Sequence, residues 1–275
     1  MKIAYFGGDV LLECLQELVQ QGHEIAFLFT NKVPAHEYDM SQQAKAIAKE
    51  QKASIIYEQP TANSLQVIDN AKCDMIVSAG YPYKIPDWQT GDIKYAINIH
   101  PSLLPEGAGP MPLPHLILKD YKTSGITLHK LSKEWDRGDI ILQKKFTVSE
   151  QDNMDILWKK ARLTSQETLK EFLTSPDKHW DNATAQKPTA DDYWKIPEGG
   201  GFGIDYYKDA QTVAKYLRIH YYIHLDGNIE SIINIEAWKE MHLHKPGTVL
   251  FEEKGQHIIA VKDGFVKFKV IQEHR

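Results

Sequence analysis

The sequence predicts an α/β protein in which a helix-covered parallel sheet precedes a small β-rich domain. Apolar runs rich in β-branched and aromatic residues alternate with helical patterns through roughly the first hundred residues. Short strand-like runs with Gly-containing turns fill the C-terminal part, and turn-forming residues dominate the segment in between. We therefore expect a first domain at 1–178, a connecting arm at 179–204 and a small C-terminal domain at 205–275.

The first half carries the repeated strand and helix pattern of a Rossmann-like sheet. Leu11, Leu15 and Leu18 recur at helical spacing after the first strand-like run. Asp9 is suited to cap the start of that helix, and Gly22 to close its end. Such sheets carry helices on both faces and bind ligands at the carboxyl ends of their strands. The expected strands lie in the runs KIAYFGG, HEIAFLFT, ASIIYEQ, CDMIVSAGY and YAINIH.

The second half begins with a Gly- and Pro-rich stretch, EGAGPMPLP, and a short apolar segment, HLILKD. Two strand-like runs follow, GITLHKL and DIILQKKFTV, joined by SKEWDRG, and a long helical pattern over 152–173 closes the first domain. Beyond the arm, DAQTVAKYLRI is suited to a helix. The runs GNIESIINIEAW and GTVLFEEKGQHIIAVKDGFVKFKVIQ then predict successive short strands of a small β-barrel or sheet.

Composition and charge narrow the class of protein. The 275 residues include 32 basic and 37 acidic side chains, a net charge of −5, so the chain has no global positive field for a nucleic-acid backbone. Cys14 and Cys73 are too few for a disulfide framework, which fits a reducing compartment. The N-terminal MKIAYFGGDV lacks a signal-peptide pattern, and no apolar run is long enough to span a membrane. We expect a soluble, cytoplasmic protein.

Gly7 and Gly8 stand between the first strand and the first helix, where a nucleotide site is one interpretation. A dinucleotide fingerprint requires Gly-x-Gly-x-x-Gly, and only this adjacent pair is present. The pair therefore favours a tight turn that lets the helix pack on the sheet. The start of the helix remains able to contact a polar ligand.

Asn98, His100 and Asp136 are the strongest candidates for chemistry. Because strand residues alternate between two faces, Asn98 and His100 share one side of the strand end, opposite Ile97 and Ile99. A carboxylate such as Asp136, arriving on a neighbouring loop, would hold a His in one tautomer and favour its charged form. An Asn amide can donate to an oxygen on which negative charge develops. The three residues therefore point to general acid–base and oxyanion chemistry.

This constellation closely resembles the signature of the folate-dependent formyltransferases, which reads here as Asn98-x-His100-x-Ser102-Leu103-Leu104-Pro105 followed by Asp136 in WDRGD. That superfamily includes methionyl-tRNA formyltransferase, glycinamide ribonucleotide transformylase and the sugar N-formyltransferases. The runs MKIAYFG and SAGYPYKIP fall where the family has its first strand and its pterin-binding loop. The C-terminal run from KPGTVLF to KFKVIQ resembles the small barrel of the transfer-RNA enzyme and some sugar enzymes, which implies an OB-like barrel.

The resemblance implies that a primary amine attacks the formyl carbon of 10-formyltetrahydrofolate, the co-substrate, and implies no metal. Asn98 and protonated His100 would then hydrogen-bond the oxyanion, while Asp136 would orient and charge His100 and help to remove the amine proton. The pterin is expected between SAGYPYKIP and SKEWDRGD. For Tyr81 and Tyr83, each taken singly, ordinary loop packing is an equal alternative to pterin binding. Its expected carriers are Ser78, Tyr81, Tyr83, Lys84, Ile85, Ser102, Leu103, Leu104 and Pro105.

The acceptor is predicted to be a small-molecule amine. An amino sugar is the first candidate, either a nucleotide-linked sugar or another precursor of a cell-surface sugar. The transfer-RNA enzymes, like several sugar enzymes, usually carry a basic Arg-Gly-containing stretch after SLLP, whereas this chain has EGAGPMPLP with acidic Glu106. From Ala190 onward there are 11 Lys and Arg against 13 Asp and Glu, where an RNA-binding domain should be basic. Nucleic-acid and membrane partners are therefore not expected. Methionyl-tRNA remains the alternative acceptor.

Some questions stay open at this level. The run GITLHKL resembles the sugar enzymes and places His129 near the site, in a structural role. Trp180 and Trp194 in the arm are expected to pack against the first domain. A folate-binding or regulatory module without catalysis is the alternative from another class of function. The oligomeric state is open, with a homodimer included.

Two pairs of histidines have spacings compatible with a metal site. His220 and His224 are four residues apart, and His242 and His244 are two apart. Neither pair comes with a Cys or carboxylate cluster, so partly exposed surface histidines are the favoured interpretation.

Overall fold

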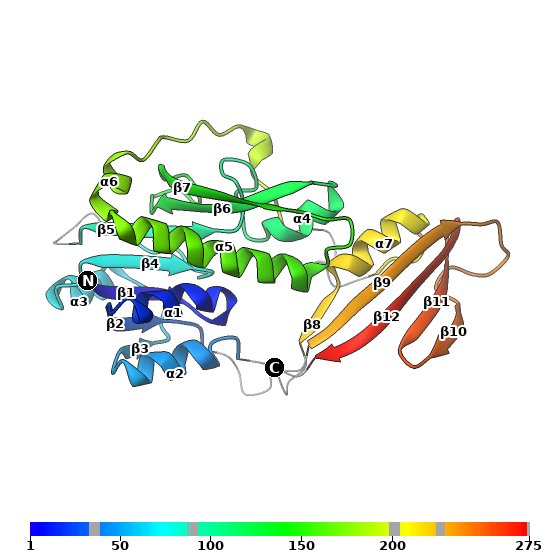
Figure 1. Cartoon of the computed structure of the whole chain (residues 1–275), viewed down its shortest axis with the longest axis horizontal. Coiled ribbons are helices and arrows are strands. Elements are labelled where there is room, and N and C mark those ends of the chain that lie inside the picture. Colours follow the sequence, from blue (N-terminus) through cyan, green and yellow to red (C-terminus); the bar gives the residue numbers. More distant parts are fainter. Residues whose placement is uncertain (33–38, 87, 89–92, 198–203, 224–228, 274–275) are drawn as a thin grey trace.

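Two β-sheets organise the chain, and Figure 1 shows them side by side. The computed structural model describes residues 1–32, 39–86, 88, 93–197, 204–223 and 229–273. Helices lie over the larger sheet, and helix α7 (Ala210–Ile219) lies against the smaller one. Within these residues, none of the helices combines the length and the apolar character that crossing a membrane requires.

The first sheet has seven strands in the order β3-β2-β1-β4-β5-β6-β7. The first five strands of that order pair in parallel, and β6 and β7 continue the sheet in antiparallel directions. The prediction of a Rossmann-like, mostly parallel sheet is therefore confirmed. The strands are β1 (Lys2–Gly7), β2 (Glu24–Phe29), β3 (Ser54–Ile56), β4 (Met75–Ala79), β5 (Tyr95–His100), β6 (Thr123–Lys130) and β7 (Ile140–Thr147).

Helices cover both faces of this sheet because its central strands are apolar on both sides. The helices of this part are α1 (Leu12–Gln20), α2 (Gln42–Glu50), α3 (Ala62–Asn70), α4 (Pro112–Leu118), α5 (Met154–Thr174) and α6 (Pro176–Asp181), with 3-10 turns η1 (Asp9–Leu11) and η2 (Ala190–Asp192). Ile3 and Tyr5 of β1 pack in the cluster that includes α1 and α5. Ala4 and Phe6 point to the opposite face, where they pack with Leu65 of α3.

Of the two residues predicted to cap the ends of helix α1, Gly22 does so and Asp9 does not. Gly22 follows α1 with φ +77°, and its N–H donates to the carbonyl of Val19, so it closes the helix as predicted. Asp9 does not cap this helix. Its carboxylate instead accepts hydrogen bonds from the backbone N–H groups of Gln43 at 3.2 Å and Ala44 at 2.8 Å, at the start of α2. The fold brings a second helix start to this carboxylate, which local spacing in the sequence does not reveal.

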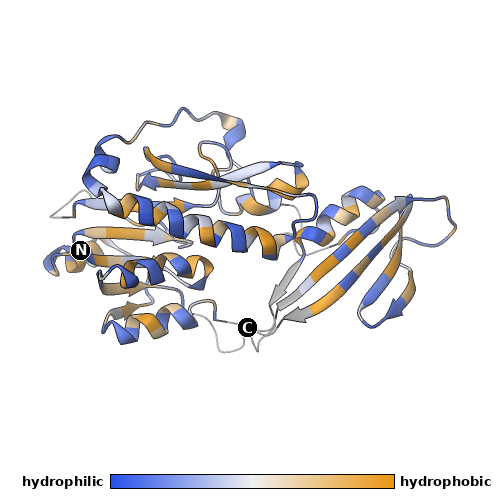
Figure 2. Ribbon diagram, viewed as in Figure 1, coloured by the Kyte–Doolittle hydropathy of each residue, from blue (hydrophilic) through white to orange (hydrophobic). Residues whose placement is uncertain are grey.

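The C-terminal part forms an antiparallel five-stranded sheet in the order β10-β11-β12-β9-β8, which confirms its predicted β-rich character. Val213 and Leu217 of α7 pack with Ile232, Val266 and Phe268 of the sheet. Figure 2 shows hydrophobic and hydrophilic bands alternating along β9 and β12, as a sheet with one covered face requires. Among the described residues this sheet is open, with β10 and β8 at its edges, and does not close into the expected OB-like barrel. The strands are β8 (Tyr221–Ile223), β9 (Ile229–Lys239), β10 (Val249–Glu253), β11 (Gln256–Val261) and β12 (Gly264–Glu273).

Polar contacts around the start of α5 join the C-terminal part of the chain to the part that forms the first sheet. Arg218 of α7 donates from Nε to the carbonyl of Asp152 at 2.8 Å and from Nη2 to the carbonyl of Ser149 at 2.9 Å. Asn153 donates from Nδ2 to the carbonyl of Ile232 at 3.2 Å. The division of the chain at 178 and 204 stays a prediction, and residues 198–203 of the predicted arm lie outside the described residues.

Candidate active site

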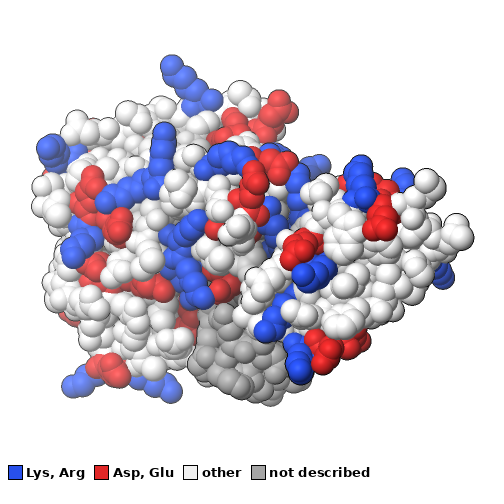
Figure 3. Space-filling view, turned by 45° about the vertical axis from the view of Figure 1, so that its right-hand side comes forward, with Lys and Arg blue, Asp and Glu red and all other residues white. Residues whose placement is uncertain are grey.

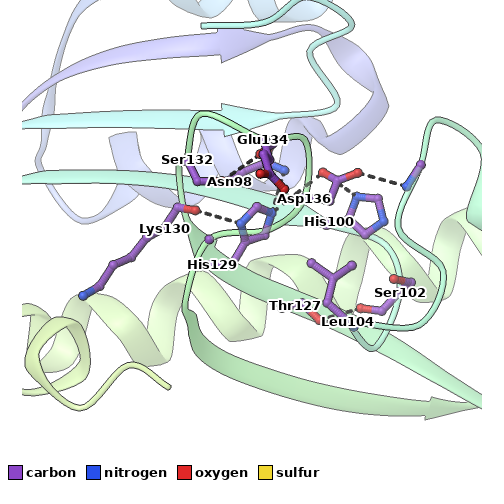
Figure 4. A network of polar contacts seen from close by, with 12 residues as sticks. Asn98, His100, Ser102, Leu104, Thr127, His129, Lys130, Ser132, Glu134 and Asp136 are labelled. Carbon is purple, nitrogen blue, oxygen red and sulfur yellow. Dashed lines mark hydrogen bonds and ion pairs between the residues drawn. The ribbon is translucent and has the colours of Figure 1, made fainter. Parts of the chain in front are cut away.

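Two neighbouring strands bring Asn98, His100 and His129 together (Figure 4). Strand β5 ends at His100, and antiparallel β6 pairs His129 with Asn98 and Thr127 with His100. Residues directly opposite each other project from the same face of a sheet, so all four side chains lie on one side. Ile97 points to the other face and is fully buried. The strand end therefore carries a polar cluster backed by an apolar core.

Asp136 reaches this cluster from the loop between β6 and β7. Its Oδ1 lies 3.5 Å from His100 Nδ1, and its Oδ2 accepts a hydrogen bond from Gly109 N at 3.0 Å. The Asp136 backbone is left-handed, with φ +54°, a conformation that Asp adopts more readily than most residues. The side chains of His100 and Asp136 are only 7% and 10% exposed, so water screens their interaction weakly.

Both ring nitrogens of His100 face protein partners. Nε2 lies 2.8 Å from the carbonyl oxygen of Gly107. Because a carbonyl only accepts, this nitrogen carries a proton. Nδ1 faces Asp136, so a ring that also carries a proton there is a cation paired with the carboxylate. The loop that follows β5 thus holds His100 in place from the side opposite to Asp136.

The turn after β5 is held by hydrogen bonds from β6 and β7. Thr127 donates from Oγ1 to the carbonyl of Ser102 at 2.6 Å and accepts from Leu104 N at 3.0 Å. Gln143 donates from Nε2 to the carbonyl of Leu104 at 2.8 Å. The side chains of Ser102 and Leu104 are buried, so in this structure they shape the loop.

The residues expected to carry the pterin fall into two groups. Ser78 pairs with Asn98 across β4 and β5 and lies beside it on the same face, 5% exposed. Tyr81 and Ile85 belong to the core on the side of α3, and the Tyr81 ring meets that of Phe6 edge-on with centroids 5.4 Å apart. Burial raises the pKa of the Tyr81 phenol to about 12, so it stays neutral. These buried side chains position the loop, as the packing interpretation of Tyr81 predicts.

Accessible surface is left on the remaining members of that set. Tyr83 and Lys84 are exposed, and Leu103 and Pro105 are half-buried. The binding role of all nine residues remains a prediction.

The connecting arm supports the loop that carries Asp136, a contribution that the sequence does not predict. Thr184 pairs with Ile140 at the start of β7. Two residues on, Gln186 donates from Nε2 to the carbonyls of Asp136 at 2.9 Å and Gly138 at 2.7 Å. Figure 1 shows this segment passing over β6 and β7 after α6. The arm therefore fixes the backbone of this loop at Asp136 and at Gly138.

Trp194, near the end of the described arm, supports the loop that faces His100. Its backbone N–H donates to the carbonyl of Ala108 at 2.7 Å. The residue is 4% exposed, and its ring packs against that of Tyr121, with ring centroids 5.4 Å apart. Ala108 stands between Gly107, which accepts from His100, and Gly109, which donates to Asp136. The expected packing of Trp194 on the first part of the chain is observed, and it reaches the candidate site.

The comparisons with known proteins agree with this geometry. A protein-family model described as formyl transferase matches residues 1–173, which is more than half of the chain. The chain belongs to the formyl transferase family. The match covers the whole first sheet, together with the Asn98, His100 and Asp136 cluster.

Methionyl-tRNA formyltransferases are similar in sequence to part of this formyl transferase family member. The methionyl-tRNA formyltransferase of Ehrlichia chaffeensis is 32% identical over 183 residues, which are 64% of this chain and 59% of the relative. The alignments span about three fifths of the length of this and the next curated relatives.

Two solved structures share the fold over nearly the whole chain. HypX from Aquifex aeolicus, a multiply substituted variant, gives a TM-score of 0.66 at 20% identity over 99% of this chain and 46% of that one. The Helicobacter canadensis N-formyltransferase, in complex with folinic acid and dTDP-3-aminofucose, gives 0.66 at 16% identity over 98% of both chains. At these identities the likeness establishes the fold.

His129 is a buried neutral side chain within the candidate site. Its Nδ1 bonds the carbonyl of Lys130 at 2.9 Å, and its Nε2 lies 3.0 Å from Asn98 Nδ2 and 3.9 Å from Asp136 Oδ1. Burial lowers the pKa of His129 to about 4, with His100 acting in the same direction and Asp136 opposing it. In the sequence, the alternation of Thr127 and His129 along β6 shows only that the two side chains share one face of the strand. It does not show that His129 lies opposite Asn98, because the pairing register with β5 cannot be inferred from neighbouring residues.

This lowered pKa predicts a pH-dependent stability. An unfolded His129 binds a proton near pH 6.5, whereas the folded one stays neutral down to about 4, so acidification through this window favours the unfolded chain. Between pH 7 and pH 5 the free energy of unfolding should fall by about 1–2 kcal/mol more in the natural protein than in a His129→Gln variant. Urea unfolding at both pH values measures the difference. Equal losses in the two proteins would contradict the assignment.

Other polar clusters do not form a metal site in the part of the chain that the structure describes. No group of three His, Cys, Asp or Glu side chains suited to a metal occurs there. His242 and His244 instead lie against each other, with ring centroids 5.8 Å apart, and His242 contacts Phe265. His224, the predicted partner of His220, lies outside the described residues.

Proposed function

We propose that the protein transfers the formyl group of 10-formyltetrahydrofolate to a primary amine of a small molecule, an amino sugar in first place. The observation that carries this proposal is the convergence of Asn98, His100 and Asp136 on one side of the β5 end, in a chain of the formyl transferase family. These residue types supply an amide donor, a polarised imidazole and a buried carboxylate, which suit acyl transfer.

The proposed reaction uses these groups in order. The amine nitrogen attacks the formyl carbon, and the carbonyl electron pair moves onto the oxygen. Asp136, the carboxylate of the set, takes part in removing the proton from the attacking nitrogen. The oxyanion then re-forms its double bond, the bond to N10 breaks, and N10 of the departing tetrahydrofolate receives a proton. The products are a formamide and tetrahydrofolate.

The hydrogen bonds of the site refine the roles of the two oxyanion partners. The Asn98 amide has two N–H groups at Nδ2, and one of them meets His129. Among the described residues the second N–H has no hydrogen-bond partner, so it can donate to the oxyanion. His100 spends its Nε2 proton on the carbonyl of Gly107. A direct hydrogen bond from His100 to the oxyanion would therefore replace that contact. If His100 keeps its contact with Gly107, protonated His100 stabilises the oxyanion through its positive charge instead of a hydrogen bond.

Several observations support a small acceptor. Glu106 is exposed next to Gly107, and its carboxylate accepts a hydrogen bond from the hydroxyl of Tyr121. A negative charge at this point suits an ammonium precursor of the attacking amine. Figure 3 shows basic and acidic side chains interspersed on the face in view, over both parts of the chain. The Helicobacter canadensis neighbour, which was solved with dTDP-3-aminofucose, shares the fold over 98% of the chain.

Methionyl-tRNA is the second candidate acceptor, because the curated relatives named above are methionyl-tRNA formyltransferases. The net charge of −5 and the acidic balance from Ala190 onward weigh against it, since RNA binding is driven largely by Lys and Arg contacts to phosphates. A folate-binding module without catalysis is the third candidate. The complete set of Asn98, His100 and Asp136 weighs against loss of catalysis.

Mass spectrometry of an amine panel tests the proposal. The purified protein is incubated with 10-formyltetrahydrofolate and each amine, including nucleotide-linked 3-amino and 4-amino sugars, glycinamide ribonucleotide and initiator methionyl-tRNA. We expect a formyl mass gain on one amino sugar and none in the absence of protein. A gain on methionyl-tRNA alone would replace the acceptor assignment. Folate binding without any product would favour the binding module.

A further inference from the structure

The contact between His129 and Asn98 determines the orientation of the Asn98 amide. The two residues are paired across β5 and β6, and Nδ2 of Asn98 lies 3.0 Å from Nε2 of His129. Figure 4 shows the His129 ring between Asn98 and the carbonyl of Lys130. His129 is 2% exposed, so water does not compete for either ring nitrogen.

The backbone of the next residue fixes the tautomer of His129. Nδ1 lies 2.9 Å from the carbonyl oxygen of Lys130. A carbonyl cannot donate, so Nδ1 carries the proton, and neutral His129 then has a lone pair at Nε2. That lone pair requires a donor from Asn98, which is the Nδ2 end of the amide. The reversed amide would place two lone pairs against each other in a buried site.

The surrounding charges keep this arrangement in place near neutral pH. Asp136 Oδ1 lies 3.9 Å from His129 Nε2, and His100 is the other titratable group acting on the ring. Burial and His100 outweigh the attraction of Asp136, so the pKa of His129 is about 4 and the ring is neutral at pH 7. A protonated His129 would offer a donor at Nε2 and would favour the opposite amide orientation.

We propose that His129 is a positioning residue that accepts a hydrogen bond from Asn98 and thereby aims the second N–H of the Asn98 amide at the developing oxyanion. This inference rests on the proposed formyl transfer. It assigns His129 a role in the reaction in place of the purely structural role that the sequence suggests. The side chain acts through Asn98 and contacts no reacting atom in this scheme.

Two substitutions separate the two contacts of His129. In His129→Asn, the shorter side chain can still bond the carbonyl of Lys130 from the position of Nδ1 but cannot reach Asn98. In His129→Gln, the terminal amide oxygen can take the place of Nε2 as an acceptor for Asn98. We expect His129→Asn to lower kcat by about 10- to 100-fold with little change in KM for the folate, because the oxyanion donor is misaligned. His129→Gln should recover most of that loss.

A double-mutant cycle with Asn98→Ala tests whether His129 acts through Asn98. We expect His129→Asn to cost little further activity once Asn98 is alanine, since the group that His129 aims is gone. The same fold-loss in both backgrounds would overturn the proposal, because it would mean that His129 acts independently. A His129→Gln variant as impaired as His129→Asn would also overturn it.

Nitrogen NMR tests the arrangement without any turnover, and so separates this inference from the proposed function. In the natural protein at pH 7, His129 is expected to show a protonated Nδ1 and an unprotonated Nε2. The Asn98 side-chain amide signal should shift in His129→Asn and stay close to its original place in His129→Gln. A His129 protonated at Nε2 would overturn the inference whatever the enzyme assays show. If the NMR result holds but no amine is formylated, the proposed function fails alone.

Discussion

Replacing Asp136 by Asn is expected to lower the rate of formyl transfer by about 10²- to 10⁴-fold, the range that a positioned acid–base group contributes. The substitution keeps the size of the side chain and an oxygen that can accept from Gly109 N, a contact of 3.0 Å in the structure. It removes the negative charge that lies 3.5 Å from His100 Nδ1 in a site where water screens charges weakly. Single-turnover formation of the formamide, followed by mass spectrometry, measures the loss.

Folate binding separates a chemical effect of Asp136→Asn from a general disruption of the site. We expect the dissociation constant of the folate, measured by isothermal titration calorimetry, to change by less than about threefold, because the carboxylate acts on the reacting atoms. Asp139→Asn is the matched control in the same loop. Asp139 is half-buried and its carboxylate lies 3.7 Å from Lys130 Nζ, so the loss of its charge should leave the rate nearly unchanged. An active Asp136→Asn enzyme would contradict the assignment of Asp136.

The sheet and the strand that carries the site follow from local patterns in the sequence. The run YAINIH alternates apolar and polar residues before a Pro-containing turn, and this predicts both strand β5 and the shared side of Asn98 and His100. Helical spacing of Leu11, Leu15 and Leu18 likewise predicts α1. These features depend on neighbours in the chain, which periodicity can detect.

The supports of the site depend instead on pairings between distant segments, which no local pattern encodes. Gln186 is 50 residues from Asp136 in the chain and bonds its carbonyl, and Tyr193 pairs with Ala108 through a single isolated bridge. One bridge has no period, so the arm reads as a plain connection in the sequence. The register that places His129 opposite Asn98 is also a property of the folded sheet.

The sequence also does not reveal which side chains of the predicted pterin loop are buried and which are exposed. Aromatic and apolar residues in a loop are suited both to stacking on a ligand and to core packing, and composition alone does not separate the two. The structure assigns Tyr81 and Ile85 to the core and leaves Tyr83 accessible. The C-terminal sheet shows a similar limit, since short antiparallel strands predict a barrel and an open sheet equally well.

A Gly138→Ala substitution is expected to damage both stability and transfer, because Gly138 packs directly on the strand that holds His129. A methyl group at this position would lie far inside van der Waals contact with the carbonyl oxygen of Lys130 and only 3.4 Å from His129 Nδ1. The same carbonyl accepts from His129 Nδ1, and the carbonyl of Gly138 accepts from Gln186 Nε2. The overpacked turn should lose about 1–3 kcal/mol of unfolding free energy.

Gly22→Ala separates the effect of Gly138→Ala on the site from its effect on stability. Gly22 has φ +77° and open space around the added methyl group, so the substitution should cost about 1–2 kcal/mol through backbone strain alone. It lies at the end of α1, away from the site, and its transfer rate should match that of the natural protein. Gly138→Ala should instead lower kcat by about tenfold or more in the fraction that is folded, because it moves the carbonyl that orients His129 and the turn that presents Asp136. Urea unfolding and single-turnover assays on both variants make the comparison. Equal rates in the two folded variants would mean that the Lys130 carbonyl can shift without disturbing Asn98 or Asp136. The contacts that link Gln186, Gly138, Lys130 and His129 to Asn98 would then have no part in catalysis.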